Sequence, residues 1–219
     1  MRDSSSGIGM TSQRTRARML DRLRDKGIRD EHVLSGIGAV ARHLFVDEAL
    51  ASRAYEDTAL PLGHSQTISQ PFIVARMIEV LLAGRPTLGK TLEIGTGCGY
   101  QTAVLAQLTD TVYSVERIEP LLQQARINLN KVGLSNIHLK YADGQMGLPE
   151  AAPFDTIIVA AAANRVPVAL MEQLSIGGRI AIPVGATEQV LYLVERKLEG
   201  FIETRLDPVR FVPLLSGME

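Results

Sequence analysis

Glycines occupy alternate positions in the stretch LEIGTGCGYQTAVLA, between an apolar run and a helical pattern. Gly95, Gly97 and Gly99 permit a sharp turn and a close approach by a ligand, because they carry no Cβ atom. The helix expected from Tyr100 onward directs its free amide groups at that ligand. The spacing is G-x-G-x-G rather than the G-x-G-x-x-G of dinucleotide sites, so pyrophosphate is not the favoured ligand. Cys98 is interpreted as a small turn residue, since no His or Arg is visibly placed to activate a thiol.

Acidic residues accompany three successive predicted strands around this turn. Glu93 precedes the glycines, Glu116 ends the second strand, and Asp143, followed by Gly144, ends the third. Glu116 follows Gly95 by about 20 residues, the separation at which a carboxylate accepts both ribose hydroxyls in doubly wound folds. Asp143 is placed to meet an adenine amino group. The combination predicts a neutral or cationic adenosine ligand, and S-adenosylmethionine fits because it carries ribose, adenine and a sulfonium but no phosphate.

Each of these features has a simpler interpretation when it is taken alone. Glycine-rich turns occur in many folds, Glu116 could end its strand in solvent, and Asp143-Gly144 could be an ordinary turn. Their joint order and spacing favour the cofactor site.

An uncharged polar stretch, HSQTISQP, lies between two apolar segments. It places Ser65, Thr67 and Ser69 just before Pro71, where a helix is expected to begin. One interpretation is that Ser69 caps this helix. The other is a loop that grips a small substrate through its hydroxyl groups, and both roles can coexist. His64 is interpreted as a loop or rim residue.

These residues must be positioned by alternating strands and helices, which the sequence shows from residue 88 onward. The predicted strands are 91–95, 111–117, 137–143, 154–161 and 179–185, with helical patterns at 100–107, 121–132 and 168–174. Strands separated by such helices predict right-handed crossovers and a mainly parallel, doubly wound α/β sheet. Segments 189–197 and 201–214 have no helix between them, so we expect an antiparallel hairpin around Glu199-Gly200.

Helical patterns also precede the sheet, at 11–26, 31–41 and 45–54. We therefore expect a flexible lead-in at 1–10 and a single domain at 11–219. Within it, 11–87 would hold the N-terminal helices and the polar loop, and 88–219 the cofactor-binding sheet and C-terminal strands.

Composition excludes several classes of protein. The formal net charge of the 219 residues is −1, which argues against a nucleic-acid partner, because such proteins usually carry a basic face. The single cysteine excludes an intramolecular disulfide, and no apolar run is long enough to span a membrane, so a cytoplasmic location is expected. No metal site is predicted. The segment AAAANRVP, at 160–167, also lacks the Asn/Asp-Pro-Pro-aromatic segment often found in enzymes that methylate amide or base nitrogens.

The chain resembles the protein-L-isoaspartate O-methyltransferases from about Thr11 to the C-terminus. The most specific matches are LPLGHSQTISQP, LEIGTGCGYQTAVLA, YADGQMG, APFDTIIVAAAA, QLSIGGRIAIPVG and RFVPL. The glycine turn and the acids are shared by many methyltransferases, whereas QTISQP and FVPL narrow the match. Two departures are Ser65, where glycine is common, and Cys98, where serine is common.

The resemblance implies a class I, Rossmann-like methyltransferase fold with extra N-terminal helices and an altered C-terminal part. It implies methyl transfer from S-adenosyl-L-methionine, leaving S-adenosyl-L-homocysteine, to the free α-carboxylate of L-isoaspartyl residues in damaged proteins and peptides. The ester then closes to a succinimide, which hydrolyses partly to normal aspartate. The implied catalytic residue is Ser69, and Ser69, Val212, Pro213 and Leu214 would contact the substrate. The expected cofactor-binding residues are Gln66, Thr67, Ile68, Glu93, Gly95, Thr96, Gly97, Gly99, Glu116, Arg117, Asp143 and Gly144.

This chemistry needs no general base, because a carboxylate with a pKa near ~4 is already ionised at neutral pH. Ser69 is therefore interpreted as a donor that positions the acceptor rather than as a nucleophile. Two alternatives stay open from the residues alone. One is another small-molecule carboxylate O-methyltransferase on the same fold, and the other is a catalytically silent protein that binds an adenosyl ligand.

Overall fold

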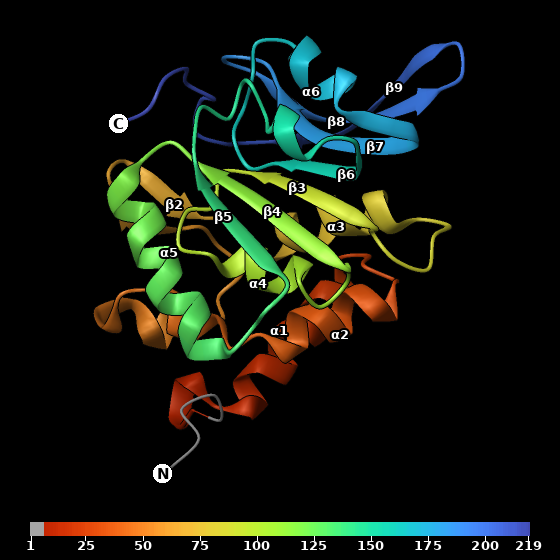
Figure 1. Cartoon of the computed structure of the whole chain (residues 1–219). Coiled ribbons are helices and arrows are strands. Elements are labelled where there is room, and N and C mark those ends of the chain that lie inside the picture. Colours follow the sequence, from red (N-terminus) through yellow and green to blue (C-terminus); the bar gives the residue numbers. More distant parts are fainter. Residues whose placement is uncertain (1–6) are drawn as a thin grey trace.

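A seven-stranded sheet in the order β5-β4-β3-β6-β7-β8-β9 runs through the computed structural model, which describes residues 7–219 (Figure 1). Its first five strands in the chain are parallel, and the last two are antiparallel. The strands are β3 (Lys90–Ile94), β4 (Thr111–Glu116), β5 (Ile137–Tyr141), β6 (Phe154–Val159), β7 (Leu174–Val184), β8 (Gln189–Lys197) and β9 (Gly200–Val209). The predicted doubly wound, mostly parallel sheet is confirmed.

The helices fall into two groups around this sheet (Figure 1). The α-helices are α1 (Gln13–Asp25), α2 (Glu31–Ala39), α3 (Pro71–Leu82), α4 (Tyr100–Leu105), α5 (Glu119–Val132) and α6 (Val168–Glu172). Short 3-10 helices are η1 (Gly9–Thr11), η2 (Arg42–Phe45), η3 (Glu48–Arg53) and η4 (Pro149–Ala151). Helices α1 to α5 lie on one side of the sheet, and α6 lies on the other (Figure 1).

Alternation along the central strands divides the core between the two faces of the sheet. In β6, Ile158 packs with the buried side chains of α1 to α5, whereas Ile157 and Val159 pack with Leu170 of α6. Successive residues of a strand point to opposite faces, so a run of apolar residues supplies both cores. This explains why β6 reads as a continuous apolar segment in the sequence.

Several boundaries differ from those expected. Strand β7 begins at Leu174 because its first residues pair with Phe154 across a bulge, and α6 accordingly ends at Glu172. The segment 45–54 contains the last residue of one 3-10 helix, η2, and the whole of another, η3, instead of one α-helix. Residues 1–6 of the expected lead-in lie outside the described residues, while Gly9–Thr11 forms η1.

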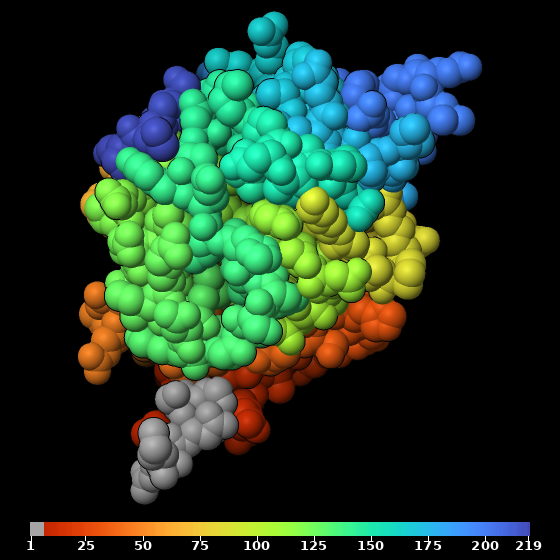
Figure 2. All heavy atoms as spheres, viewed as in Figure 1, coloured from red at the N-terminus to blue at the C-terminus, as the bar shows by residue number. Residues whose placement is uncertain are grey.

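The C-terminal hairpin is confirmed, with its turn at Leu198 and Glu199 between β8 and β9. The tip of the hairpin projects from the body of the molecule in the space-filling view (Figure 2), and Leu198 in its turn is 84% exposed.

The polar stretch forms a second, two-stranded sheet that the sequence did not predict. Strands β1 (Leu60–Gly63) and β2 (Gln66–Ile68) pair antiparallel, with His64 and Ser65 between them. Both turn residues have positive φ, 50° and 56°, as a two-residue type I′ hairpin turn requires. The positive φ at position 65 favours glycine, the residue that is common there in the family that the chain resembles.

Candidate functional site

A cavity of about 770 Å³ opens where the parallel strands β3, β4 and β6 end. This is the edge at which doubly wound sheets bind ligands. Among the residues predicted from the sequence, those that line it are Gln66, Thr67, Ile68, Ser69, Gly95, Thr96, Gly97, Glu116, Arg117, Gly144, Val212, Pro213 and Leu214. The fold thus brings the polar hairpin, the glycine turn and the C-terminal RFVPL segment to one site.

The glycine turn uses its three glycines in two different ways. Gly95 and Gly97 have φ of 93° and 54° and line the cavity with bare backbone. Gly99 also has a positive φ, 87°, but it lies outside the lining. A Cβ atom there would stand 3.0 Å from Cγ of Leu129, so Gly99 allows the start of α4 to pack closely on α5.

Glu116 lies at the end of β4 with its carboxylate facing the turn. Its Oε2 accepts a hydrogen bond from the Gly97 N–H at 2.9 Å, and its Oε1 accepts from the N–H groups of Arg117 and Ile118 at 2.9 and 3.0 Å. The carboxylate is held firmly, and it lines the cavity while only 6% of the residue is exposed. An oriented carboxylate at a strand end matches the place predicted for a ribose contact.

Glu93 is placed behind the cavity lining rather than in it. It is fully buried and accepts hydrogen bonds from Nε2 of Gln101, Oγ1 of Thr102 and Oγ of Ser114. Ser114 Oγ also lies 2.7 Å from Oγ1 of Thr96 in the turn. Burial raises the pKa of Glu93 to about 7, although these hydrogen bonds counteract the shift. Glu93 therefore ties the start of α4 and the turn to the sheet.

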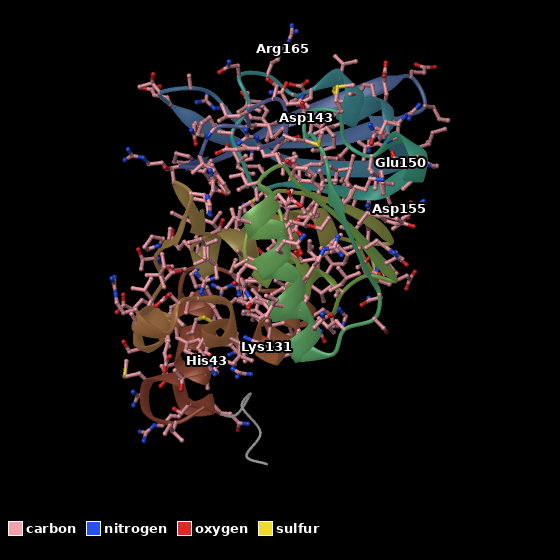
Figure 3. The ribbon with its side chains drawn as sticks, turned by 60° about the vertical axis from the view of Figure 1, so that its left-hand side comes forward. His43, Lys131, Asp143, Glu150, Asp155 and Arg165 are labelled. Carbon is pink, nitrogen blue, oxygen red and sulfur yellow. The ribbon has the colours of Figure 1, made fainter. Side chains whose placement is uncertain are left out.

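Asp143 is likewise outside the lining, and its carboxylate is engaged by backbone groups. Its Oδ1 accepts from the Gln145 N–H at 2.9 Å and its Oδ2 from the Gly217 N–H at 2.7 Å. In Figure 3 it lies just beyond β5, near the C-terminal part of the molecule. Arg117 secures the same tail through a 3.0 Å ion pair with Glu219. Gly144 lines the cavity, and a Cβ atom there would be 2.4 Å from Cγ2 of Ile94.

Ser69 lies between β2 and α3 and lines the cavity, half-buried. The residue that precedes the first turn of α3 is Gln70, and no side chain at that position caps the helix. Among residues 7–219 the Ser69 hydroxyl has no hydrogen-bond partner, so it is not engaged as a helix cap. It is a donor available to a ligand in the cavity.

Asp57, rather than Ser69, accepts hydrogen bonds at the start of α3, a role that the sequence did not reveal. Its Oδ1 accepts from the Phe72 N–H at 2.9 Å and its Oδ2 from Nε2 of Gln70 at 3.0 Å. Burial alone would raise the pKa of Asp57, but its hydrogen bonds with Lys26, Phe72 and Gln70 hold the pKa below its ordinary value. No periodic pattern or motif distinguishes this aspartate from others in a loop.

The C-terminal RFVPL segment lies along the residues that follow β6. The Ala162 N–H donates to the Val212 carbonyl at 2.8 Å, and the Leu214 N–H donates to the Ala162 carbonyl at 2.7 Å. Pro213 stands opposite Ala162 in this short parallel pairing. The segment therefore closes the cavity beside the small residues 160–163.

The chemistry of the lining fits the predicted adenosyl ligand. Bare backbone at Gly95 and Gly97, an oriented carboxylate at Glu116 and a volume of about 770 Å³ suit a ribose and an adenine. The lining contains two basic residues, Arg117 and Arg210, and the guanidinium of Arg117 is engaged with Glu219. Among residues 7–219 the lining therefore offers no group of three or more cations for a phosphate. Burial raises the pKa of the Cys98 thiol to about 11, which agrees with its interpretation as a turn residue.

Residues 7–219 contain neither a cluster of metal-binding side chains nor a membrane-spanning helix. No group of three or more His, Cys, Asp or Glu side chains there is arranged to hold a metal ion. Within the same range, none of the helices is both long and apolar enough to cross a membrane.

Comparison with known proteins gives consistent matches over most of the chain. The family model of protein-L-isoaspartate(D-aspartate) O-methyltransferase matches residues 14–219. A protein-L-isoaspartate O-methyltransferase of Dechloromonas aromatica is 68% identical over 213 residues, which cover 97% of this chain and 99% of that protein.

Solved structures with the same description are also similar. A protein-L-isoaspartate O-methyltransferase superposes with a TM-score of 0.81 at 28% identity, covering 90% of this chain and 65% of that one. A putative one from Plasmodium falciparum, solved in complex with S-adenosyl-L-homocysteine, has a TM-score of 0.79 at 27% identity. That match covers 90% of this chain and 96% of the other.

Proposed function

This chain belongs to the protein-L-isoaspartate O-methyltransferase family, and from that premise we propose how its own residues perform the family's reaction. It is an S-adenosylmethionine-dependent methyltransferase that methylates isoaspartyl residues of damaged proteins, a repair reaction. The observation that carries the assignment of the site is the meeting of the polar hairpin and the glycine turn in one cavity.

We assign cofactor binding to the part of the cavity formed by the strand ends. Glu116 accepts hydrogen bonds from the ribose hydroxyls, and the backbone of Gly95 and Gly97 allows the adenosyl group to approach closely. Gln66, Thr67, Ile68, Thr96, Arg117 and Gly144 complete this part of the lining. Glu93, Gly99 and Asp143 support it from behind, through the contacts that hold the turn, α4 and the C-terminal tail.

The bound cofactor supplies an activated methyl group on a sulfonium. The protein must align the acceptor carboxylate with that group and exclude water. We assign alignment to the Ser69 hydroxyl, an uncharged donor that orients a carboxylate oxygen without the charge of a lysine. Buried Ile68 and the half-buried Leu214 line the same cavity and exclude water.

We assign the peptide to the side of the cavity formed by Val212, Pro213 and Leu214. The formal net charge of −1 supports a protein rather than a nucleic-acid substrate. The free, buried thiol of Cys98 supports a cytoplasmic location.

Labelled S-adenosylmethionine and a matched pair of peptides test the function. The peptides have the same sequence and differ only in containing isoaspartate or aspartate at one position. Label should enter the isoaspartyl peptide and be absent from the aspartyl peptide. Equal labelling of both peptides, or none of either, would contradict the assignment. Labelling of free small carboxylic acids but of neither peptide would instead favour a small-molecule O-methyltransferase.

A further inference from the structure

Arg42 is a completely buried cation in η2, next to the His43 that Figure 3 labels among the N-terminal helical elements. Its hydrogen bonds go to main-chain carbonyls: Nε donates to Ala54 and Nη2 donates to Ser69, both at 2.8 Å. Among residues 7–219 no carboxylate forms an ion pair with Arg42, so the cost of burying its charge is not offset in that way.

The contacts of Arg42 join two sides of the cavity. Its guanidinium carbon lies 4.6 Å from the ring centroid of Tyr100, the first residue of α4 after the glycine turn. Ser69 and Tyr100 both line the cavity, whereas Arg42 lies directly behind them. One guanidinium therefore contacts the backbone of Ser69, the proposed acceptor-binding residue, and the side chain of Tyr100, which directly follows the glycine turn.

The residues that follow Ser69 are held by a different charged residue. Asp57 binds Gln70 and Phe72, immediately after Ser69, and itself pairs with Lys26 of the N-terminal region. Arg42 alone contacts the Ser69 carbonyl among these residues. Loss of Asp57 would release the start of α3, whereas loss of Arg42 would release the Ser69 peptide group.

Two buried polar atoms of the contact between Arg42 and Tyr100 make no hydrogen bond of ordinary geometry within residues 7–219, although the two side chains interact electrostatically. They are Nη1 of Arg42 and the hydroxyl oxygen of Tyr100. Unpaired buried polar groups are rare in structural networks, because each one costs free energy. One of these groups belongs to a residue of the lining, Tyr100, and the other to Arg42 behind it, so this costly contact lies at the cavity.

We propose that Arg42 is a positioning residue for methyl transfer: through the Ser69 carbonyl and the Tyr100 ring it fixes Ser69 relative to the glycine turn. The planar guanidinium donates in two directions at once and stacks on an aromatic ring, which a lysine ammonium does not reproduce. The inference rests on the proposed role of Ser69, because Arg42 acts on the acceptor through that residue.

The test uses Arg42→Ala and Arg42→Lys in the full chain, beside the wild type. We expect kcat/KM for an isoaspartyl peptide to fall at least about tenfold in both, as for the loss of one charged hydrogen bond, with kcat accounting for most of the change. The Kd of S-adenosylhomocysteine should stay close to that of the wild type. Millimolar guanidinium, but not ammonium at equal ionic strength, should partly restore kcat of Arg42→Ala.

Arg179→Ala provides the matched control. Arg179 also donates to two main-chain carbonyls, those of Leu81 and Ala83, but at the opposite end of α3 from Ser69. Its loss should lower stability while leaving kcat per folded molecule unchanged and unaffected by guanidinium.

Hydrogen exchange of the free protein gives a readout that does not depend on activity. In Arg42→Lys, the amides of residues 67–72 should exchange faster than in the wild type, and in Arg179→Ala they should not. Wild-type kcat and KM in Arg42→Lys, or guanidinium rescue of the melting temperature without rescue of kcat, would overturn the proposal. An inactive wild type would instead refute the proposed function, so the two failures are distinguishable.

Discussion

Among the single residues, Glu93 shows how burial sets the chemistry of a carboxyl group. Burial raises its pKa to about 7, whereas a glutamate in the unfolded chain ionises near ~4.3. Between these values the folded state holds more protons than the unfolded state, so the stabilising contribution of the protonated group is lost as pH rises through that window. Above about pH 7 the contribution of Glu93 to the free energy of unfolding no longer changes with pH.

Glu93→Gln should therefore flatten the pH dependence of stability. As the pH rises from about 5 to about 7, the free energy of unfolding of the variant should increase relative to that of the wild type by up to about 3 kcal/mol. Urea denaturation at several pH values measures this, with the exposed Glu119→Gln as the control. Parallel stability curves for Glu93→Gln and the wild type would show that Glu93 is ionised in the folded protein.

Glu116 differs from Glu93 because its carboxylate lines the cavity. Glu116→Ala should weaken the binding of S-adenosylhomocysteine by about 1.5–3 kcal/mol, the value of hydrogen bonds to a charged group. Isothermal titration calorimetry measures the change. Glu119→Ala, which removes a neighbouring acid outside the lining, should bind normally. Unchanged affinity in Glu116→Ala would remove this residue from the cofactor site.

A Ser69→Ala variant tests the proposed role of this hydroxyl in binding the methyl acceptor. Since its hydroxyl has no partner among residues 7–219 and Asp57 serves the start of α3, Ser69→Ala should leave stability nearly unchanged. Turnover of an isoaspartyl peptide should fall roughly 10- to 100-fold, while cofactor affinity is mostly kept. Steady-state kinetics and thermal melting separate the two effects, with Ser65→Ala as the control. A loss of stability at normal turnover would favour the capping interpretation.

At the scale of elements, the β1–β2 hairpin carries a local conflict between sequence and conformation. Ser65 has φ of 56° in a turn that favours glycine. A residue with a Cβ atom costs about 1 kcal/mol or more in the left-handed region, and glycine avoids this cost. Part of that gain is offset because glycine also makes the unfolded chain more flexible.

Ser65→Gly should accordingly raise the free energy of unfolding by about 0.5 kcal/mol or slightly more. Chemical denaturation measures the difference, and Ser65→Ala, which keeps the Cβ atom, should show no gain. If glycine destabilises the protein, the serine must contribute a contact that offsets its strain.

At the scale of the whole molecule, the N-terminal helices and the sheet share one core. Met19 of α1 and Leu34 of α2 belong to the same buried cluster as Val104 of α4 and Ala181 of β7. Arg42 and Asp57 connect the N-terminal part to the cavity as well. The segments 11–87 and 88–219 are therefore parts of one proposed domain.

The full chain should unfold in a single cooperative transition. Far-ultraviolet circular dichroism and tyrosine fluorescence should give coincident denaturation curves, and a fragment of residues 88–219 should not fold alone, because its core face would be uncovered. Two separated transitions, or a folded fragment, would divide the chain into two domains.

The sequence by itself determined the features that depend on neighbouring residues. Strand and helix periods, the glycine turn and the position of Glu116 at a strand end are local patterns, and they were sufficient for the doubly wound fold and the cofactor. The structure confirmed the sheet and placed Gly95, Gly97 and Glu116 together.

Only the tertiary structure decided which side chains face the cavity and which lie behind it. Glu93 and Glu116 look alike as acids beside strands, and both are buried, yet Glu93 is bound by side chains of α4 and only Glu116 lines the cavity. Arg42 and Asp57 showed no signal in the sequence, because their partners at Ser69 and Phe72 are brought to them by the fold. Contacts between distant segments depend on how all the elements pack, and no local pattern records them.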